Sequence, residues 1–384
     1  MKKVDENTLE ITGYELLAGL PDPFLKDSGE RISSPGQWAE RRAELYSSCI
    51  GLQYGGMPPE PEFVEVETLY KAKTCSYLIS TGTRARPVRF RMQVVLPDYP
   101  WAIREKVPAI VDGDLCFGYH FDRDFIHAAL DNNIAWVLFD RTELAHDVVG
   151  EGRCKGQIYE TYPECRAGAL AAWAWGYSRC VDALGKTDLP VDLEWIAFTG
   201  HSRGGKTAAL AGAVDERARI VNPNETCAGS CGCYRVHMKG RCGDIPEGRS
   251  ETLKDIWGNF PFWFGEDLGE YADDETLLPF DAHFLKAMVA PRTLFVSEAA
   301  GDLWSNPVGS WQTTEAAREV FDFLGVRDRL YWYFRPGVHA HATEDVEMLV
   351  NVILHEKNGA VPTDERMYRL PFVPPAKAYS WEKP

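Results

Sequence analysis

Residues 193–214 read LEWIAFTGHSRGGKTAALAGAV, and this stretch decides the fold class. An apolar run, LEWIAFT, leads into Gly200-His201-Ser202-Arg203-Gly204, and a run of helical composition, KTAALAGAV, follows. A G-x-S-x-G motif between a strand and a helix is the context in which this motif presents a nucleophilic serine. Side chains at the two glycine positions would clash in so tight a turn. The stretch therefore predicts that Ser202 lies at the start of a helix, where the helix dipole and the next backbone N–H favour an oxyanion.

The chain around this turn alternates buried strands with helices. Helical stretches such as 163–184 and 205–214 separate several short apolar runs that end in polar residues. These runs are VPAIVDGD (107–114), IAWVLFDR (134–141), ARIVNPNE (218–225), RTLFVSEAAGD (292–302) and LYWYFRPGVH (330–339). Such alternation predicts a mostly parallel sheet covered by helices, with functional groups at the carboxyl ends of the strands. The sequence is thus typical of an α/β-hydrolase fold.

The residues before the parallel sheet have a different pattern. Residues 63–80 and 86–97 are rich in β-branched and aromatic residues with partial alternation, which predicts antiparallel strands. Residues 36–49 resemble a short helix. The fold class that follows is an α/β hydrolase with an N-terminal antiparallel extension.

We expect two parts in the domain organisation. Residues 1–35 are polar and contain three prolines, which favours an irregular N-terminal arm. Residues 36–384 then form a single α/β-hydrolase domain. Within it, residues 235–285 are acidic, aromatic and less regular, and they are candidates for a lid or a substrate wall.

A catalytic triad requires a histidine after a later strand and a carboxylate between the serine and that histidine. His339 comes first after the strand LYWYFRPG, and His341, two residues later, is its rival. Two carboxylates compete for the third role, because Glu225 and Asp302 each end a predicted strand. The acid holds the imidazole tautomer and stabilises the imidazolium. The pattern alone leaves both acids open, with Asp302 in the position usual for this fold.

The sequence resembles the glucuronoyl esterases of carbohydrate esterase family fifteen. The elbow of that family is Gly-Cys-Ser-Arg-x-Gly-Lys, and this chain has Gly200-His201-Ser202-Arg203-Gly204-Gly205-Lys206. FDRTELAHD before the elbow, and FPFWFGEDLGEY, LPFDAHFLKAMVAPRTLFVSEA and FRPGVHAHA after it, resemble other family segments. The resemblance covers roughly residues 36–355, and the elbow with its Arg and Lys is the most specific part of it.

The resemblance implies a role for each matching residue. Ser202 would be the nucleophile and His339 the general base, while the Arg203 guanidinium would stabilise the oxyanion. Lys206 would hydrogen-bond sugar hydroxyls, and Glu251 and Trp304 fall in the sugar-contacting region. The triad acid of many family members corresponds to Glu225 and that of others to Asp302. On this basis the resemblance favours Glu225, with Asp302 as a substitute or helper.

The chain departs from the family at two points. His201 replaces the cysteine that usually precedes the nucleophile. The family is mostly secreted, whereas Asp5, Glu6 and Glu10 interrupt any apolar segment near Met1, so we expect no signal peptide and a cytoplasmic enzyme. A secreted chain trimmed of its leader would have a similar sequence. A cytoplasmic member would act on imported fragments rather than on intact polymer.

Charge and cysteine content limit the partners and cofactors. The 384 residues carry a net charge of −16, which argues against binding to nucleic acid or to an anionic membrane surface. Ten cysteines in a cytoplasmic chain are expected to be free thiols. Cys227, Cys231, Cys233 and Cys242 cluster, but a C-x₃-C-G-C run without a second pair fits a zinc site poorly. We therefore expect no metal and no organic cofactor, and the sequence specifies no oligomeric state.

The sequence thus predicts a serine carboxylic-ester hydrolase that cleaves esters of glucuronic or 4-O-methyl-glucuronic acid through an acyl-enzyme. Its expected partner is a small carbohydrate ester. One alternative is an esterase that removes acetyl or other acyl groups from sugars with the same triad. A second is a catalytically inactive, carbohydrate-binding relative, which the intact set of Ser, His and acid argues against.

Overall fold

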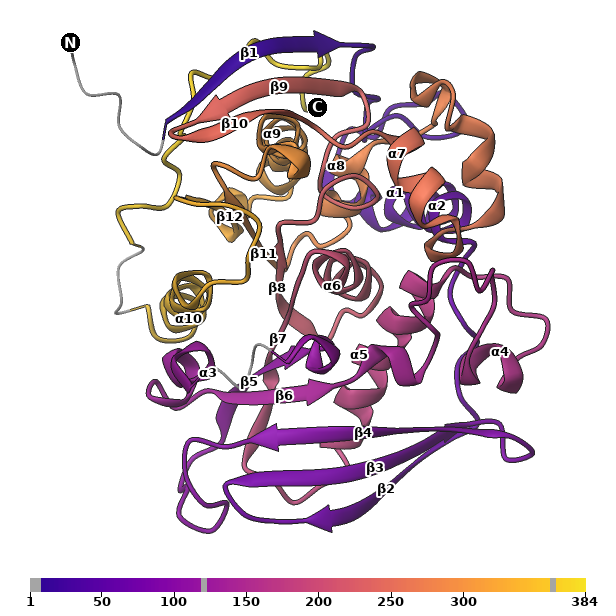
Figure 1. Cartoon of the computed structure of the whole chain (residues 1–384), viewed down its shortest axis with the longest axis vertical. Coiled ribbons are helices and arrows are strands. Elements are labelled where there is room, and N and C mark those ends of the chain that lie inside the picture. Colours follow the sequence, from indigo (N-terminus) through magenta and orange to yellow (C-terminus); the bar gives the residue numbers. More distant parts are fainter. Residues whose placement is uncertain (1–7, 119–122, 360–363) are drawn as a thin grey trace.

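The computed structural model describes residues 8–118, 123–359 and 364–384, and its centre is a nine-stranded sheet (Figure 1). The strand order is β12-β11-β8-β7-β5-β6-β4-β3-β2. The strands from β12 to β6 are parallel, and β4, β3 and β2 continue the sheet antiparallel. The strands are β2 (Phe63–Tyr70), β3 (Thr74–Gly82), β4 (Pro87–Val95), β5 (Val107–Asp112), β6 (Ala135–Phe139), β7 (Val191–His201), β8 (Ala218–Asn224), β11 (Thr293–Ala299) and β12 (Leu330–Arg335). This arrangement confirms the predicted parallel sheet with its antiparallel extension.

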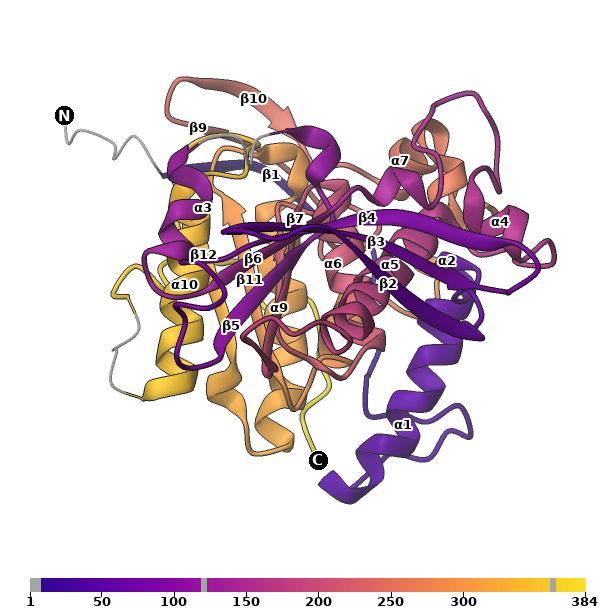
Figure 2. The same ribbon diagram turned by 90° about the horizontal axis from the view of Figure 1, so that it is seen from below.

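Helices cover both faces of the sheet, as Figure 2 shows in the edge-on view. On one face α3 (Arg123–Leu130) packs against α10 (Thr343–Asn358). On the other lie α5 (Ala169–Leu184), α6 (Arg203–Val214), α8 (Ala282–Ala287) and α9 (Pro307–Phe323). The remaining α-helices are α1 (Trp38–Leu45), α2 (Leu52–Tyr54), α4 (Gln157–Thr161) and α7 (Leu253–Asn259). Because helices lie on both sides, all residues of β5, β6 and β11 are buried, as their continuous apolar runs predicted.

Two predicted elements have different bounds in the structure. The segment 63–80 contains two strands, because a turn separates β2 from β3. The helix expected over 163–184 begins only at Ala169. Gly168 precedes it, its N–H donates to Tyr54 O at 2.8 Å, and a Cβ on Gly168 would overlap the backbone of Trp263. This close packing of three chain segments fixes where the helix starts.

A separate three-stranded antiparallel sheet has the order β1-β9-β10. It joins β1 (Leu9–Leu16) to the hairpin of β9 (Val236–Cys242) and β10 (Ile245–Arg249) (Figure 1). The prediction of an irregular arm over 1–35 is therefore wrong for Leu9–Leu16. The partner strand of β1 lies more than 200 residues further along the chain, so the local pattern gives no sign of the pairing. Residues 1–7 lie outside the described part of the chain.

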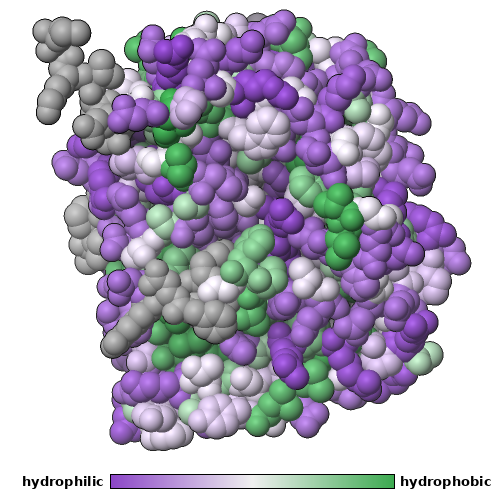
Figure 3. Space-filling view, in the orientation of Figure 1, coloured by the Kyte–Doolittle hydropathy of each residue, from purple (hydrophilic) through white to green (hydrophobic). Residues whose placement is uncertain are grey.

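The face of the molecule seen in Figure 1 is largely hydrophilic, with apolar residues in small separate groups (Figure 3). In the part of the chain that the structure describes, no helix combines the length and the apolar composition needed to cross a bilayer.

Candidate active site

The elbow holds Ser202 in a backbone conformation that few residues adopt. Its φ is +58° and its ψ is −119°, between the end of β7 and the first residue of α6. A Cβ on Gly200 would lie 2.5 Å from Gly204 O, and a Cβ on Gly204 would overlap the carboxylate of Asp114. Buried Asp114 in turn accepts a hydrogen bond from the backbone N–H of His201 at 2.8 Å. The two glycines and Asp114 thus close the turn around the serine, as the motif predicted.

Ser202 opens into a cavity of about 340 Å³ at the carboxyl ends of the parallel strands. Seven of the eight predicted site residues line this cavity. The eighth, Glu225, does not line it but contacts His339. Its lining residues are Ser202, Arg203, Lys206, Cys227, Glu251, Phe260, Trp263, Asp302, Trp304 and His339. These residues come from the turn after β7, from α6 and from the segments that follow β8, β10, β11 and β12. The sheet therefore brings together side chains that are far apart in the sequence.

His339 faces two carboxylates. Its Nδ1 donates a hydrogen bond to Asp302 Oδ2 at 2.6 Å and lies 3.3 Å from Glu225 Oε2. Asp302 follows β11 and Glu225 follows β8, which are adjacent parallel strands. The resemblance favoured Glu225 as the partner of His339, but the shorter contact is made by Asp302. Both acids that the sequence left open are within reach of the same ring nitrogen.

The surroundings of the two carboxylates differ. Fully buried Glu225 pairs with the guanidinium of Arg335 and accepts a hydrogen bond from Ala340 N at 3.1 Å. Burial raises the pKa of Glu225 well above its usual value, although His339 and Arg335 oppose the change. Burial acts on Asp302 in the same sense, but hydrogen bonds from His339 and Ser305 keep the pKa of Asp302 below its usual value. The site therefore favours the negative charge on Asp302.

The two acids change the proton affinity of His339. Burial opposes a charge on this ring, but the hydrogen bonds with Asp302 and Glu225 outweigh it and raise the pKa of His339 to about 9. The His339 side chain is 40% exposed, so the face of the ring directed away from the acids is accessible. The imidazolium form of His339 is therefore favoured by its surroundings, and the ring can accept a proton only where it is first unprotonated.

His201 and His341 lie behind His339 and remain neutral. The His201 ring centroid is 4.5 Å from that of His339, and Nδ1 of His201 bonds to Asn224 Oδ1 at 2.7 Å. Burial and the nearby His339 lower the pKa of His201 to about 3. His341, the rival candidate for the triad, packs against His201 and the ring of Phe125 and is absent from the cavity lining described above. Of the two candidates, His339 is therefore the one that lines the cavity beside Ser202.

Arg203 is held beside Ser202 by one carboxylate and two rings. Its Nη1 donates to Asp147 Oδ2 at 3.0 Å, and its guanidinium carbon lies 4.9 Å from the Trp263 ring and 5.4 Å from the Phe260 ring. These two rings stack on each other with centroids 3.9 Å apart. Trp263 Nε1 donates to the other oxygen of Asp147, also at 3.0 Å. Asp147 therefore fixes both the cation and the ring beneath it.

The opposite side of the cavity carries Lys206, Glu251 and Trp304. Lys206 is only 3% exposed and its Nζ donates to the carbonyl of Thr226, so it is a buried cation rather than a lysine on a helix surface. Glu251 is buried as well, and burial raises its pKa against the effect of the nearby Lys206 charge. Trp304 is 40% exposed, with the guanidinium of Arg249 5.1 Å from its ring centroid. This side of the cavity thus combines two buried charged residues, Lys206 and Glu251, with the partly exposed ring of Trp304.

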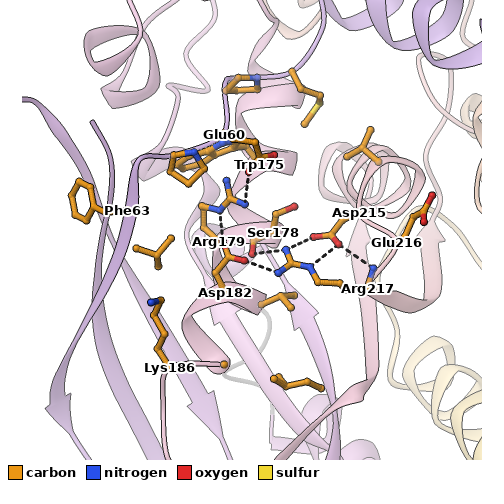
Figure 4. A pocket seen from close by; sticks show the side chains of 18 of the residues that line it. Glu60, Phe63, Trp175, Ser178, Arg179, Asp182, Lys186, Asp215, Glu216 and Arg217 are labelled. Carbon is orange, nitrogen blue, oxygen red and sulfur yellow. Dashed lines mark hydrogen bonds and ion pairs between the residues drawn. The ribbon is translucent and has the colours of Figure 1, made fainter. Parts of the chain in front are cut away.

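A larger cavity of about 1020 Å³ lies at the other end of the parallel strands and contains none of the predicted site residues (Figure 4). Several of its charged groups pair with one another. Arg217 bonds to Asp182 at 2.6 Å and to Asp215 at 2.7 Å, and Arg179 bonds to Asp182 at 2.7 Å. Size alone therefore does not identify the site.

Sequence reasoning missed several residues that shape the cavity. Asp147 ends the segment FDRTELAHD, and Phe260 and Trp263 belong to FPFWFGEDLGEY. Both segments resemble the family, but the resemblance assigned no role to these three residues. Arg335 likewise belongs to the family segment FRPGVHAHA, whereas Cys227 was noted only as a member of the cysteine cluster. Their roles arise from side chains that meet only in the folded chain.

Comparisons with known proteins show which family this chain resembles. A sequence profile described as "Glucuronyl esterase, fungi" matches residues 79–325. The 4-O-methyl-glucuronoyl methylesterase 1 of Wolfiporia cocos is 29% identical over 326 residues, which is 84% of this chain and 76% of the relative. A 4-O-methyl-glucuronoyl methylesterase of Hypocrea jecorina is 30% identical over 84% of this chain and 66% of its own length. A carbohydrate esterase family 15 glucuronoyl esterase from Caldicellulosiruptor kristjansonii superposes with a TM-score of 0.82 at 28% identity, covering 96% of this chain and 98% of the other.

Proposed function

Because the chain belongs to the glucuronoyl esterase family, we propose that it hydrolyses carboxylic esters of glucuronic or 4-O-methyl-glucuronic acid. The uronic acid is the acyl half of the ester, and the alcohol leaves. The single observation that carries the proposal is that Ser202, Arg203, Lys206 and the His339–Asp302 pair share one cavity.

In the proposed reaction Ser202 Oγ attacks the ester carbonyl carbon while His339 Nε2 takes the hydroxyl proton. The carbonyl π electrons move to oxygen and form a tetrahedral oxyanion. When the oxyanion collapses, the C–O bond to the alcohol breaks, and His339 gives its proton to the leaving oxygen. Water then attacks the acyl-enzyme by the same route, releasing the uronic acid and restoring Ser202.

The oxyanion is stabilised by groups whose positions the fold fixes before substrate binds. Ser202 precedes the first turn of α6, where backbone N–H groups have no carbonyl partner within a helix and can donate to an oxyanion. Arg203 adds a full positive charge held by Asp147, Trp263 and Phe260. A fixed cation beside developing negative charge lowers the barrier without reorganisation.

Asp302 orients the Nδ1–H of His339 and stabilises the imidazolium. Glu225 Oε2, 3.3 Å from the same nitrogen, also stabilises the imidazolium. Lys206 and Glu251 bond to sugar hydroxyls, and Trp304 packs against the sugar at the rim of the cavity. The burial of Lys206 and Glu251 supports these assignments, because buried polar groups directed at a cavity suit a polar ligand such as a uronic acid.

The experiment that tests this function compares hydrolysis of benzyl glucuronate with hydrolysis of p-nitrophenyl acetate. We expect turnover of the glucuronate by the wild type and a loss of about 10³-fold or more in Ser202→Ala. The matched control is Ser47→Ala, at an exposed serine remote from the cavity, which should keep wild-type turnover.

Turnover of the acetate alone would retain Ser202 as nucleophile and overturn the uronic-acid assignment in favour of acylated sugars. Turnover of neither ester, with glucuronate binding detected by calorimetry, would identify an inactive carbohydrate-binding relative.

A further inference from the structure

Three side chains with metal-binding atoms meet in the cavity. Cys227 Sγ, a carboxylate oxygen of Asp302 and a ring nitrogen of His339 all lie within 4.8 Å of one another. Among residues 8–118, 123–359 and 364–384, this is the one such group of three. Cys227 has no part in the proposed hydrolysis, so its position beside the triad is unexplained by that reaction.

The hydroxyl of Ser305 connects the thiol to the carboxylate. Ser305 Oγ lies 3.1 Å from Cys227 Sγ and donates a hydrogen bond to Asp302. Asp302 in turn accepts from His339 Nδ1 at 2.6 Å. The three donor side chains are thus joined through short contacts, and the cavity of about 340 Å³ lies open beside them.

We propose that Cys227, Asp302 and His339 form an inhibitory site for Zn²⁺, with water from the cavity as the fourth ligand. Zinc prefers thiolate, imidazole and carboxylate ligands in tetrahedral geometry. A thiolate and a carboxylate together carry two negative charges, which balance the dication. Zinc binding at this site does not depend on the proposed function. The inhibition does, because it requires that His339 and Asp302 take part in ester hydrolysis.

The required movement is small. Ligand bonds of about 2.0–2.3 Å place the donors around one zinc ion roughly 3.3–3.6 Å apart. The His339 and Asp302 atoms must separate by less than about 1 Å from their 2.6 Å contact, and the thiol must move inward by a comparable amount. His339 is 40% exposed, so it can turn toward the ion without repacking the core.

Charged groups near the site partly offset one another. The buried Lys206 ammonium faces the cavity and opposes a cation, while Glu251 favours one, and the charge of Glu225 is offset by its partner Arg335. Burial raises the pKa of the Cys227 thiol, so the ion must supply the free energy that removes its proton. Coordination needs the Cys227 thiolate and an unprotonated nitrogen of His339, so the protons on these atoms are released to solvent. Once the ion is bound, Asp302 and His339 coordinate it, so His339 can no longer take the proton of the Ser202 hydroxyl.

The other cysteines of the predicted cluster do not share this arrangement. Cys231, Cys233 and Cys242 are buried free thiols and none belongs to the group of three. The sequence predicts no metal, and the proposed mixed site departs from that prediction at Cys227, the one cysteine of the cluster that it uses.

The test uses the full chain, freed of metal by a chelator, and has two readouts. The first is inhibition of benzyl glucuronate hydrolysis by Zn²⁺, with each variant normalised to its own uninhibited rate. The second is the thiolate-to-metal charge-transfer absorption of Co²⁺, which needs no catalytic activity. We expect the wild type to be inhibited reversibly and to show the cobalt band, and we expect Cys227→Ser to need about tenfold or more zinc for half-inhibition.

A second variant keeps the test decisive if Cys227→Ser folds poorly. His339→Ala, at a partly exposed residue, keeps the thiol but should lose the cobalt band. Cys116→Ser, at an exposed thiol outside the group of three, should respond to both metals like the wild type.

A cobalt band that persists in both Cys227→Ser and His339→Ala, or its absence from the wild type, would overturn the site. If no ester is hydrolysed but the band appears and depends on Cys227 and His339, the proposed function fails and the metal site stands. If hydrolysis occurs without zinc inhibition or a band, the function stands and the metal site fails.

Discussion

His339 Nδ1 and Asp302 Oδ2 are 2.6 Å apart, the shorter of the two contacts that the imidazole makes with a carboxylate. Hydrogen bonds hold the pKa of Asp302 below its usual value, whereas burial raises that of Glu225. The carboxylate closest to His339 is thus also the one whose charge the site favours. Glu225 contributes through its link to Arg335, which also pairs with buried Asp345.

The first prediction concerns these two acids. Asp302→Asn should lower kcat for glucuronate esters by about 10⁴-fold, because it removes the acceptor that selects the productive tautomer of His339. Glu225→Gln should cost less, about 10- to 100-fold, because Asp302 still orients the ring. Steady-state kinetics on both variants provides the measurement. The opposite order of losses would make Glu225 the principal acid.

The pH dependence of the reaction should follow His339. The base must be unprotonated in the free enzyme, and its hydrogen bonds to carboxylates raise its pKa to about 9. We expect kcat/KM to increase with pH toward an apparent pKa near this value. Asp302→Asn removes an interaction that favours the imidazolium, so the rise of kcat/KM with pH should occur at lower pH in this variant. A rise at the same pH in wild type and Asp302→Asn would contradict the assignment.

The same shift affects the stability of the fold. The pKa of His339 is higher in the folded chain, about 9, than its ordinary value of 6.5. The imidazolium therefore stabilises the native state fully below pH 6.5, and this contribution is lost as the pH rises through 9. We expect the difference in Tm between wild type and His339→Gln to be larger at about pH 5.5 than at about pH 9.5. Thermal unfolding of both proteins across this range is the measurement, and a constant difference would count against the shift.

Arg203 and Asp147 should behave as a coupled pair. Arg203→Ala should lower kcat by about 10²- to 10³-fold with little change in KM, because it removes charge that acts on the oxyanion. Asp147→Asn should cost about tenfold, because the guanidinium loses its anchor but keeps its contacts with the rings of Trp263 and Phe260.

The double variant separates positioning from a merely structural role. If Asp147 acts through Arg203, Asp147→Asn should have almost no further effect on kcat in the Arg203→Ala background. Additive losses would show that Asp147 acts independently. Arg203→Lys is the conservative control, and it should recover only part of the rate, because lysine cannot reproduce the planar contacts with Trp263.

Much of the fold followed from local patterns in the sequence. The parallel strands were found because each is buried on both sides and so appears as a continuous apolar run, as in β5, β6 and β11. Ser202 was found because its turn excludes side chains at Gly200 and Gly204. These features depend on short stretches of chain, where sequence determines conformation directly.

Features that depend on distant contacts were not predicted. The choice between Glu225 and Asp302 depends on how Arg335, Ala340 and Ser305 compete for their oxygens. Asp147 and Trp263 are 116 residues apart in the sequence, and only the folded chain brings them into a hydrogen bond beside Arg203. The burial of Glu251, which the resemblance matched only loosely, results from the path of the chain after β10.

The pairing of β1 with β9 sets an order of events during synthesis. Leu9 pairs with Cys242, so β1 leaves the ribosome more than 200 residues before its partner exists. At about 5–20 residues per second, this strand waits roughly 10–45 s with an unpaired edge. The hairpin that leads into Glu251 can complete its sheet only when that early segment is still available. Completion of this cavity wall therefore depends on one of the first segments of the chain to be made.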